Sequence, residues 1–567
     1  MKKTTMKVFG VSLAIAVVAL CLVMMRTHPV SAQNSPGASS RPVVNHAIRF
    51  AVSPPLRELV KQQQNQPRYG FHQAEPVRHP KLTRLMENVG RGPVMDGALQ
   101  KLILPKVSAV PGLNLLGVGV GFPNYSVPDA PPDENLSVGP TQVVEWVNVS
   151  YAVFNKTTGA VELGPIEGNL LWQSLGGPCS ANNDGDIIAQ FDKIAQRWVL
   201  AQNVFAGPPY YTCIAVSKTS DATGSYYEYQ YSQPGFPDYP KWGVWPDAYY
   251  QSQNDFGPSG GGFVGVNACA YDRSKLLVGD SSALQICFLD SSNGTLFDDS
   301  MLPGDLDSAI RPPGGEPEVY LGSIDNFNPG TAIYEYLFHV DFADPADSTF
   351  TGENGAMPIT VASYGLGCGG FAACIPQKGI SDVLDSLGDR LMYRLAYSNF
   401  VRTTPPTTAS ELDHQSWLVS HSVTSPSGQV GERWYEFRAP EGSTTLTEYQ
   451  QDTFAPDSNY RWMGSIAQDK LGDMLLGYSI SSSTMYPSIN YTGRVPTDPL
   501  GTMETEAQMF AGTGSQIDTA DRWGDYTDMA IDSQDSCTFW YVNEYYTVTG
   551  TFAWSTRLGS FKFPGCS

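Results

Sequence analysis

Near the end of the chain, a short half-apolar run, a polar turn and an aromatic run follow one another. Tyr526 to Ile531 is the first run, Asp532 to Ser536 is the turn, and Thr538 to Tyr545 is the second run. Two apolar runs separated by a short cluster of turn-forming residues predict a β-hairpin. The same layout returns at 462–478 and at 187–201. A hairpin that recurs along a chain indicates a repeat architecture.

Seven such hairpin-bearing units can be recognised between Pro132 and the end of the chain. Their spacing of roughly 50 to 80 residues suits four-stranded blades with variable loops. None of the units has sustained 3.6-residue apolar periodicity, so helices should be rare. The units begin near Asp133, Asp184, Asp238, Glu316, Asp385, Arg461 and Asp525. The pattern predicts an all-β, seven-bladed β-propeller over residues 106–567.

The last unit supplies only three strands, at 526–531, 538–545 and 557–563. A ring of blades closes best when one blade combines strands from both ends of the chain, because closure leaves only short edges. A Gly-rich apolar segment lies upstream, within Val107–Phe122. We predict that this segment pairs with the C-terminal strands.

The first 32 residues have the three parts of a secretory signal peptide. Residues 1–7 are basic, Val8–Met25 is apolar, and Val30-Ser31-Ala32 fits a small-residue cleavage site. An exported protein, secreted or periplasmic, is therefore predicted. The alternative is an apolar segment that stays uncleaved as an N-terminal anchor.

Residues 33–105 carry no sustained pattern. Their glutamines, prolines and scattered charges are typical of a loosely ordered linker or prosegment. Short helices are predicted within this segment at 56–62 and 81–86. The ordered propeller is expected to begin after it.

Composition agrees with a β fold and excludes some partners. Hydrophobic residues make up 41% of the chain and charged residues only 16%, while Gly (55) and Pro (42) are plentiful. Few charges and many turn formers favour strands over helices. The net charge of −21 argues against nucleic acid, which requires a basic surface, and against adhesion to anionic lipid. A soluble monomer is expected.

Eight of the nine cysteines lie beyond the signal segment. An even number of cysteines in an exported chain indicates disulfides, each of which stabilises the fold by roughly 2–4 kcal/mol. The spacings do not resemble a CxxC zinc site. Cysteines that are neighbours in sequence can pair within one unit: Cys179 with Cys213, Cys269 with Cys287, Cys368 with Cys374, and Cys537 with Cys566.

The starts of the units, together with Ala215–Tyr229, resemble the sialidase-like (BNR-type) β-propeller superfamily. The resemblance covers roughly residues 130–565 and is closest in style to exported bacterial propellers of unassigned function. It implies the propeller fold. The Ser-x-Asp-x-Gly-x-Thr-Trp turn of true sialidases is absent, and 220–226 is only a loose relative of it. The arginine triad and Tyr/Glu pair of sialidases have no matching positions here, so the resemblance does not carry sialidase activity.

In a propeller, the start of each innermost strand faces one end of the central channel, so residues far apart in sequence should meet there. A channel end lined with carboxylates, cations and aromatic rings suits glycoside hydrolysis, with one carboxylic acid protonating the leaving oxygen and a second carboxylate acting as base or nucleophile. An arginine there can hold the carboxylate of an acidic sugar. The predicted catalytic residues are Asp133, Asp186, Asp238, Glu316 and Asp525. The predicted substrate-binding residues are Lys241, Arg461, Trp462, Arg522 and Tyr526.

Each of these residues also has a structural interpretation. An aspartate at the start of a strand often accepts backbone N–H bonds in a turn. Tryptophan and tyrosine are more often part of the core than a platform for sugar rings. Neither interpretation is excluded by the sequence.

A Ca²⁺ site is a further hypothesis. Asn182-Asn183-Asp184-Gly185-Asp186 gathers oxygen donors around a glycine turn, and Ca²⁺ takes six to eight oxygens. Asp184 and Asp186 are its predicted ligands, although the segment lacks the distant glutamate of an EF-hand. No cofactor is otherwise expected.

Motifs for other hydrolytic chemistry are missing: the sequence has no Gly-x-Ser-x-Gly, no HExxH and no P-loop. The leading hypothesis is therefore an extracellular, carbohydrate-active hydrolase that acts on a glycan or polysaccharide at the channel mouth. The alternative is a non-catalytic propeller that binds glycan or protein at the cell surface. A third possibility, a lyase, requires a base and a charge-neutralising cation.

Overall fold

The computed structural model describes residues 41–63 and 96–567, except for 124, 129, 259–260, 292–298, 309, 324–328, 371, 402–412, 518–520 and 552. The predicted signal peptide and the predicted helix at 81–86 lie outside the described residues. Strands dominate, and the helices are short: α2 (Leu56–Gln63), α3 (Pro178–Ala181), α4 (Arg273–Leu276), α5 (Gly352–Gly355) and the 3₁₀ turns η1 (Gly168–Trp172), η2 (Pro345–Asp347) and η3 (Gly367–Gly369). The predicted all-β character and the helix at 56–62 are confirmed.

The first three large sheets are antiparallel and follow the order of the chain. One contains β4 (Glu134–Val138), β5 (Gln142–Val147), β6 (Ser150–Asn155) and β7 (Val161–Glu167). The next contains β8 (Ile187–Asp192), β9 (Arg197–Val204), β10 (Tyr210–Ser217), β11 (Tyr226–Gln233) and, as a fifth strand, β2 (Arg49–Val52). The third contains β12 (Phe236–Val244), β13 (Ala248–Phe256), β14 (Phe263–Asp272), β15 (Leu284–Asp290) and, as a fifth strand, β1 (Val43–His46).

A nine-stranded sheet follows, in which two antiparallel groups are joined by a short parallel pairing of β16 with β23 and by β20. Its first group is β16 (Leu302–Leu306), β17 (Glu318–Gly322), β18 (Gly330–His339), β19 (Thr349–Phe350) and β20 (Met357–Leu366). Its second group is β23 (Met392–Phe400), β24 (His414–Thr424), β25 (Val430–Pro440) and β26 (Thr447–Phe454). Between the groups lies a small hairpin of β21 (Ile375–Pro376) and β22 (Val383–Leu384).

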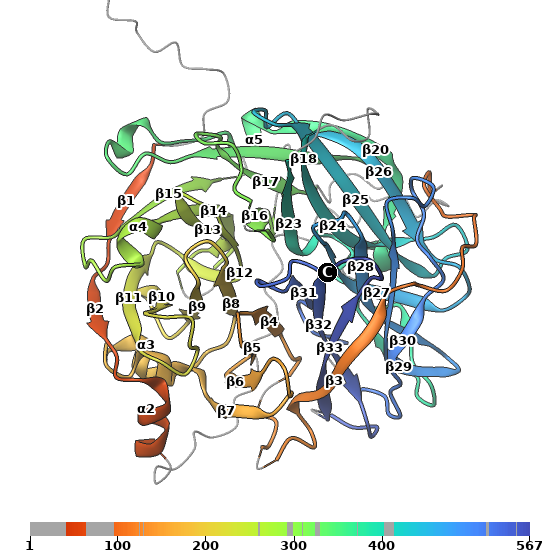
Figure 1. The fold of residues 1–567 in the computed structure, drawn as a ribbon, viewed down its shortest axis with the longest axis horizontal. Helices are drawn as coiled ribbons and strands as arrows, with labels where there is room; N and C mark the ends of the chain where they lie inside the picture. The colour runs from red at the N-terminus through yellow and green to blue at the C-terminus, as the bar shows by residue number, and fades with distance from the viewer. Residues whose placement is uncertain are drawn as a thin grey trace, which may run out of the picture.

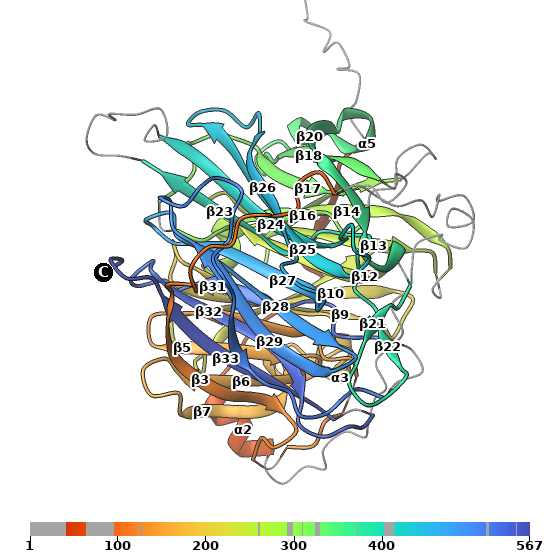
Figure 2. The ribbon, with the colours of Figure 1, turned by 90° about the vertical axis from the view of Figure 1, so that its right-hand side faces the viewer.

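Two more sheets complete the fold. One contains β27 (Tyr460–Gln468), β28 (Met474–Ser482), β29 (Met485–Arg494) and β30 (Ala507–Phe510). The other contains β31 (Asp528–Ile531), β32 (Thr538–Tyr546), β33 (Trp554–Lys562) and β3 (Val110–Gly119). The predicted pairing of the 107–122 segment with the C-terminal strands is confirmed, since Leu115 lies opposite Leu558 in the antiparallel pair β3–β33. Both ribbon views show β3 beside β33 (Figures 1 and 2).

The sheets stand around a central axis, as the blades of a β-propeller do (Figure 1). The first strand of each group is the innermost. Successive innermost strands contact one another in a closed ring, in the order β4, β8, β12, β16, β23, β27, β31 and back to β4. Because the ring closes, the starts of these strands face the same end of the axis.

The segment before the propeller is more ordered than the sequence indicated. The prediction of a loose linker is wrong for residues 41–63, which form β1, β2 and α2 on the outer rim (Figure 1). It is also wrong for residues 96–105, where Leu99 bridges Thr453 and the main chain of 105 accepts a hydrogen bond from Thr505. The physical reason is that these contacts are largely backbone hydrogen bonds to exposed sheet edges, which need no hydrophobic pattern.

All four predicted disulfides are confirmed: Cys179–Cys213, Cys269–Cys287, Cys368–Cys374 and Cys537–Cys566. The core between the sheets is largely aromatic. Trp242 stacks on Tyr271 with ring centroids 5.0 Å apart, and Tyr397 meets Trp417 edge to face at 4.9 Å. Among the described residues, no helix is long and apolar enough to cross a membrane.

Candidate functional site

Charged side chains gather where the innermost strands begin. They come from the starts of β4, β8, β12, β16, β23 and β31, and we call them the mouth cluster. Its carboxyls are Asp133, Asp186, Asp238, Asp299, Asp385, Asp389 and Asp525, and its cations are Lys241, Arg390 and Arg522. Most of these residues are buried, so their charges interact through protein rather than through water.

Asp133 connects two strands of the ring and stands near a like charge. Its Oδ1 accepts the backbone N–H of Asp525 at 3.1 Å, and its Oδ2 accepts Nδ2 of Asn148 at 3.0 Å. Burial and the negative charge of Asp186 raise the pKa of the Asp133 carboxyl to about 7, although Arg522 and Lys241 oppose the rise. Asp133 is therefore poised to carry a proton near neutral pH.

Asp525 lies beside Asp133 but in a different environment. Its carboxylate forms an ion pair with Arg522, which also approaches Asp385 at 3.4 Å. An adjacent guanidinium stabilises the charged form of a carboxylate. Asp133 thus stands near a like charge, whereas Asp525 is paired with a guanidinium.

Lys241 occupies the middle of the cluster and is fully buried. Its Nζ lies 3.4 Å from the ring centroid of Tyr239 and 3.6 Å from that of Tyr526, and it donates to the carbonyl of Pro240 at 3.2 Å. Ring faces attract an ammonium ion. Burial nevertheless holds the pKa of Lys241 well below its usual range, although Asp186 raises it.

The remaining cation, Arg390, is also committed to a partner. Its Nε and Nη2 bind the two oxygens of Asp389 at 3.0 and 2.8 Å, and its guanidinium lies 4.6 Å from the Tyr239 ring centroid. Asp299 faces this pair, and burial raises the pKa of the Asp299 carboxyl to about 7.

Tyr526 contributes a buried polar atom to the cluster. It is 1% exposed, and its hydroxyl has no hydrogen-bond partner among the described residues. Burial and the nearby carboxyls of Asp186 and Asp133 raise the pKa of Tyr526 well above its usual range. Across the axis, the Tyr239 hydroxyl donates to the Asp525 carbonyl at 3.2 Å.

Backbone strain is concentrated at this end of the ring. Positive φ angles outside glycine are uncommon and cluster at functional or tightly constrained sites. Near the starts of successive innermost strands they occur at Asp186 (47°), Tyr239 (53°), Ser300 (57°), Leu387 (42°), Met463 (54°) and Asp521 (57°). Around Tyr239, the pairing of β12 with β13 shifts register between Asp238 and Lys241. Such a bulge re-aims side chains, and Lys241 lies on the bulged segment.

The mouth cluster includes most of the residues that the sequence proposed. Asp133, Asp186, Asp238, Asp525, Lys241, Arg522 and Tyr526 belong to it. Sequence reasoning missed Asp299, Asp389 and Arg390 as site residues. An acidic pair directly before a short apolar run, Asp298-Asp299 before Leu302, was the available signal for the first of them.

Three proposed residues lie elsewhere, and their placement in the mouth is corrected. Glu316 precedes β17, which is the second strand of its group, and accepts a hydrogen bond from Gln415 at 3.3 Å. Arg461 is bound by Glu506 and Asp457. Trp462 is fully buried against Trp523, with ring centroids 5.6 Å apart, so it offers no face to a sugar.

The proposed Ca²⁺ ligands turn toward different backbone segments. Asp184 Oδ2 accepts the N–H of Phe205 at 2.8 Å, whereas Asp186 Oδ2 accepts the N–H of Tyr239 at 3.0 Å. Both carboxylates thus bind backbone groups that are distant in sequence. The Ca²⁺ hypothesis stays a prediction.

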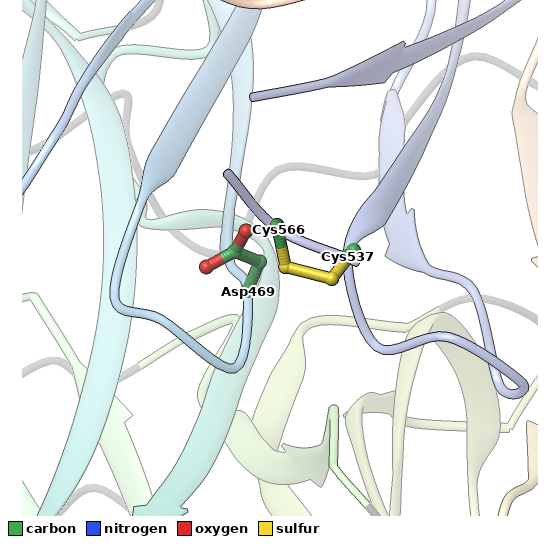
Figure 3. Close-up of side chains that lie close together, drawn as sticks. All are labelled: Asp469, Cys537 and Cys566. Atoms are coloured by element: carbon green, nitrogen blue, oxygen red, sulfur yellow. A yellow bond between two sulfur atoms is a disulfide. The ribbon is translucent and has the colours of Figure 1, made fainter. Parts of the chain in front are cut away.

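Another group of potential metal ligands occurs elsewhere in the described part of the chain. Asp469, Cys537 and Cys566 have ligand atoms within 4.8 Å of one another. Figure 3 shows the Asp469 carboxylate beside the two sulfur atoms, which are joined in a disulfide. A disulfide offers no thiolate, so this group is structural in its oxidised form.

Further along the strands, a second charged network crosses the axis. Arg394 of β23 binds Asp305 at 2.6 Å and Asp307 at 2.7 Å, and Lys193 binds Asp307 at 3.0 Å. Arg394 also donates to the carbonyl of Met529, on β31, at 3.1 Å. The bond from Arg394 to Met529 and the ion pair of Lys193 with Asp307 link strands that are not neighbours in the ring, whereas the Arg394–Asp305 pair links the neighbours β23 and β16. They fasten the interior of the channel, which leaves the mouth cluster at one end of the axis.

Comparisons with known proteins give structural similarity only. No family model matches the chain, and no curated protein matches it. A neuraminidase-like N11 protein from A/flat-faced bat/Peru/033/2010 is 10% identical, with 72% of this chain and 98% of that chain covered and a TM-score of 0.32. An endo-arabinase from Bacteroides thetaiotaomicron is 12% identical, with 54% and 92% covered and a TM-score of 0.25.

The catalytic domain of the Coprinopsis cinerea GH62 α-L-arabinofuranosidase is 10% identical, with 58% of this chain and 92% of that chain covered and a TM-score of 0.25. Similar structures therefore include a neuraminidase-like protein and two proteins named for arabinose-containing substrates. All three TM-scores are below 0.5, so these similarities carry no argument about activity or site.

Proposed function

We propose that this chain is an exported, seven-bladed β-propeller that hydrolyses glycosidic bonds at the mouth cluster. The observation that carries the proposal is the pair Asp133 and Asp525. The two residues are in contact, since the backbone N–H of Asp525 donates to the Asp133 carboxyl. The Asp133 carboxyl lies near that of Asp186, whereas the Asp525 carboxylate is paired with Arg522. Neighbouring carboxyls with different proton affinities are the requirement for acid and base roles in one site.

In this mechanism, protonated Asp133 donates its proton to the leaving glycosidic oxygen. Ionised Asp525 then acts as the base that activates water or as the nucleophile that attacks the sugar. Arg522 keeps Asp525 charged during the step. Lys241 places its amine near Asp186, although burial holds the pKa of Lys241 well below its usual range.

The wider parts of the proposal have separate support. The closed ring of innermost strands supports seven blades. Four disulfides and the N-terminal pattern support export to an extracellular or periplasmic space. A glycan ligand, a monomeric protein and a Ca²⁺ ion at Asp184 and Asp186 complete the proposal.

A second candidate function is a non-catalytic glycan- or protein-binding propeller. It is favoured by a specific observation: several mouth carboxyls accept backbone N–H bonds, as capping residues do. Asp133 accepts from Asp525, Asp186 from Tyr239 and Asp385 from Trp523. The two candidates differ in turnover, because a binding module retains ligand without cleaving it.

The test is hydrolysis of a panel of chromogenic glycosides and polysaccharides by the wild type, Asp133→Asn and Asp525→Asn. Removal of a general acid or base should lower the turnover number by roughly 10²–10⁴-fold. The matched control is Asp347→Asn, since Asp347 lies in the exposed turn η2. Turnover in the wild type that both mouth variants retain would refute the assignment. Binding without turnover in the wild type would favour the second candidate.

A further inference from the structure

The sequence suggested that an arginine holds the carboxylate of an acidic sugar, but the three cations of the mouth cluster are already engaged. Arg390 binds both oxygens of Asp389, and Arg522 lies between Asp525 and Asp385. Lys241 is enclosed by the rings of Tyr239 and Tyr526. A ligand carboxylate would have to break one of these arrangements and leave a buried charge without its partner, which is costly.

Carboxyls also outnumber cations in the cluster. Seven aspartates face three cations. Burial raises the pKa values of Asp133, Asp299 and Asp385 to about 7, 7 and 6, and it also raises the pKa of Asp186. When those four are protonated, three carboxyls still face three cations. The mouth therefore does not become positive near neutral pH.

Two further buried carboxyls adjoin the cluster. Burial raises the pKa values of Glu134 and Glu544 well above their usual range, and each side chain has an Oε2 without a hydrogen-bond partner among the described residues. Both side chains are almost completely buried, at 1% and 0% exposed. Unpaired carboxyl oxygens attract a hydrogen-bond donor or a positive charge.

The cluster has the chemistry of an ammonium site. It holds one ammonium, that of Lys241, between two tyrosine rings and near Asp186, Asp133 and Asp238. Beside this ammonium, the buried Tyr526 hydroxyl has no hydrogen-bond partner among the residues described and can accept an N–H. Carboxylates, ring faces and a hydroxyl acceptor are the groups that recognise a protonated amine.

We propose that the mouth cluster selects a glycan that carries protonated amines, an amino sugar, and rejects sugars that carry carboxylates. The inference rests on the proposed function, in that it takes the mouth cluster as the glycan site. It specifies the substrate class through the engaged arginines, the surplus of carboxyls and the tyrosine hydroxyl. A site with a free arginine would prefer an anionic sugar, so the two hypotheses predict opposite charge preferences.

Binding of three tetrasaccharides by isothermal titration calorimetry tests the inference. The probes are the tetramers of glucosamine, N-acetylglucosamine and galacturonic acid, which are cationic, neutral and anionic at about pH 6. The glucosamine tetramer should bind at least about tenfold more tightly than its N-acetylated counterpart, and the galacturonate tetramer should bind most weakly. Added salt should shrink the difference, because screening weakens charge interactions.

Variants separate the mouth from the overall charge of the protein, which is −21. Asp525→Asn and Tyr526→Phe should each reduce the preference for the glucosamine tetramer by about threefold or more. Asp347→Asn, which removes an exposed carboxylate in η2, should leave the preference unchanged. Circular dichroism and melting temperature establish that each variant is folded.

Some results would overturn the inference. They are equal or tighter binding of the galacturonate tetramer, absence of binding by all three probes, or a cationic preference that both mouth variants retain in full. Release of reducing ends, measured on the same mixtures, tests the hydrolase separately. A preference for the cationic tetramer without cleavage would contradict the proposed hydrolysis and support the proposed charge preference. Cleavage of the galacturonate tetramer would support hydrolysis and contradict the charge preference.

Discussion

Replacing Arg394 with methionine should destabilise the protein in a pH-dependent way. The guanidinium is 4% exposed and binds Asp305 and Asp307, while Asp528 lies 3.5 Å from its Nε. Methionine has a similar length and no charge, so the variant keeps most of the packing and loses the cation. Three buried carboxyls then share Lys193 as their remaining cation in this network.

The magnitude follows from the burial of these groups. Removing one partner of a buried ion pair typically costs about 3–5 kcal/mol, because the other charge stays buried without compensation. Arg394→Lys should cost less, since it keeps the charge but cannot bind Asp307 through two nitrogens. An exposed pair provides the control: Lys61→Met, which removes the partner of Glu58 at 3.1 Å, should cost less than about 0.5 kcal/mol.

The sign of the pH dependence can be derived from Asp528. Burial raises the pKa of its carboxyl in the folded protein to about 8, from an ordinary value of 3.8, and Arg394 opposes this rise. Between these two values the folded state binds more protons than the unfolded state, so stability falls as pH rises. Without Arg394 the folded-state pKa rises further. The stability deficit of the variant should therefore be larger at pH 8 than at pH 5.

Urea unfolding at these two pH values, followed by fluorescence, measures the effect as a shift of the midpoint. For a chain of this size, a loss of 3–5 kcal/mol corresponds to a midpoint lowered by roughly 0.5–1 M. The comparison uses midpoints because a large protein need not unfold in two states. A midpoint that equals that of the wild type, or a shift that is the same at both pH values, would refute this account of the network.

Two further predictions concern packing. Gly477→Ala should lower the urea midpoint by an amount equivalent to about 1–3 kcal/mol, because the new Cβ would meet the buried ring of Tyr541 at 2.4 Å. The control is Gly314→Ala, because a Cβ at that position has no atom within 4 Å. Equal midpoints for the two variants would contradict the prediction. Deleting residues 41–63 removes the fifth strands β1 and β2 together with buried Leu56 and Leu59. The melting temperature should therefore fall by several degrees while the far-ultraviolet circular dichroism persists. An unchanged melting temperature would show that this segment contributes no stability.

Much of the fold could be predicted because its units are local. A hairpin and a disulfide within one unit join residues that are close in sequence, so their patterns are visible without a structure. The segments 41–63 and 96–105 could not be found in this way. Val43 and Val44 are exposed, at 52% and 39%, and the four-residue strand β1 is held by backbone pairing with β15. A short edge strand with no buried face leaves no alternation to detect.

The fourth and the sixth of the predicted units show why the site was only partly predicted. The innermost strand β16 spans only five residues and contains Pro303 and Gly304, so the stronger apolar run of β17 was mistaken for it and Glu316 was assigned to the mouth. In β27, the pairing shifts register between Trp462 and Ser465. A shift of register changes the face of the sheet to which each side chain points. The position of such a shift cannot be predicted from alternation in the sequence.

The two charged networks on the axis contain the same residue types but differ in how their charges are paired. In the inner network, Asp305 and Asp307 are both bound directly by Arg394, and Asp528 lies beside it. These ion pairs fasten strands to one another. In the mouth cluster, carboxyls exceed cations and the Tyr526 hydroxyl has no partner among the described residues. Under the proposal, a protonated amine donates to the Tyr526 hydroxyl and faces the carboxyls of the cluster, which satisfies buried polar groups.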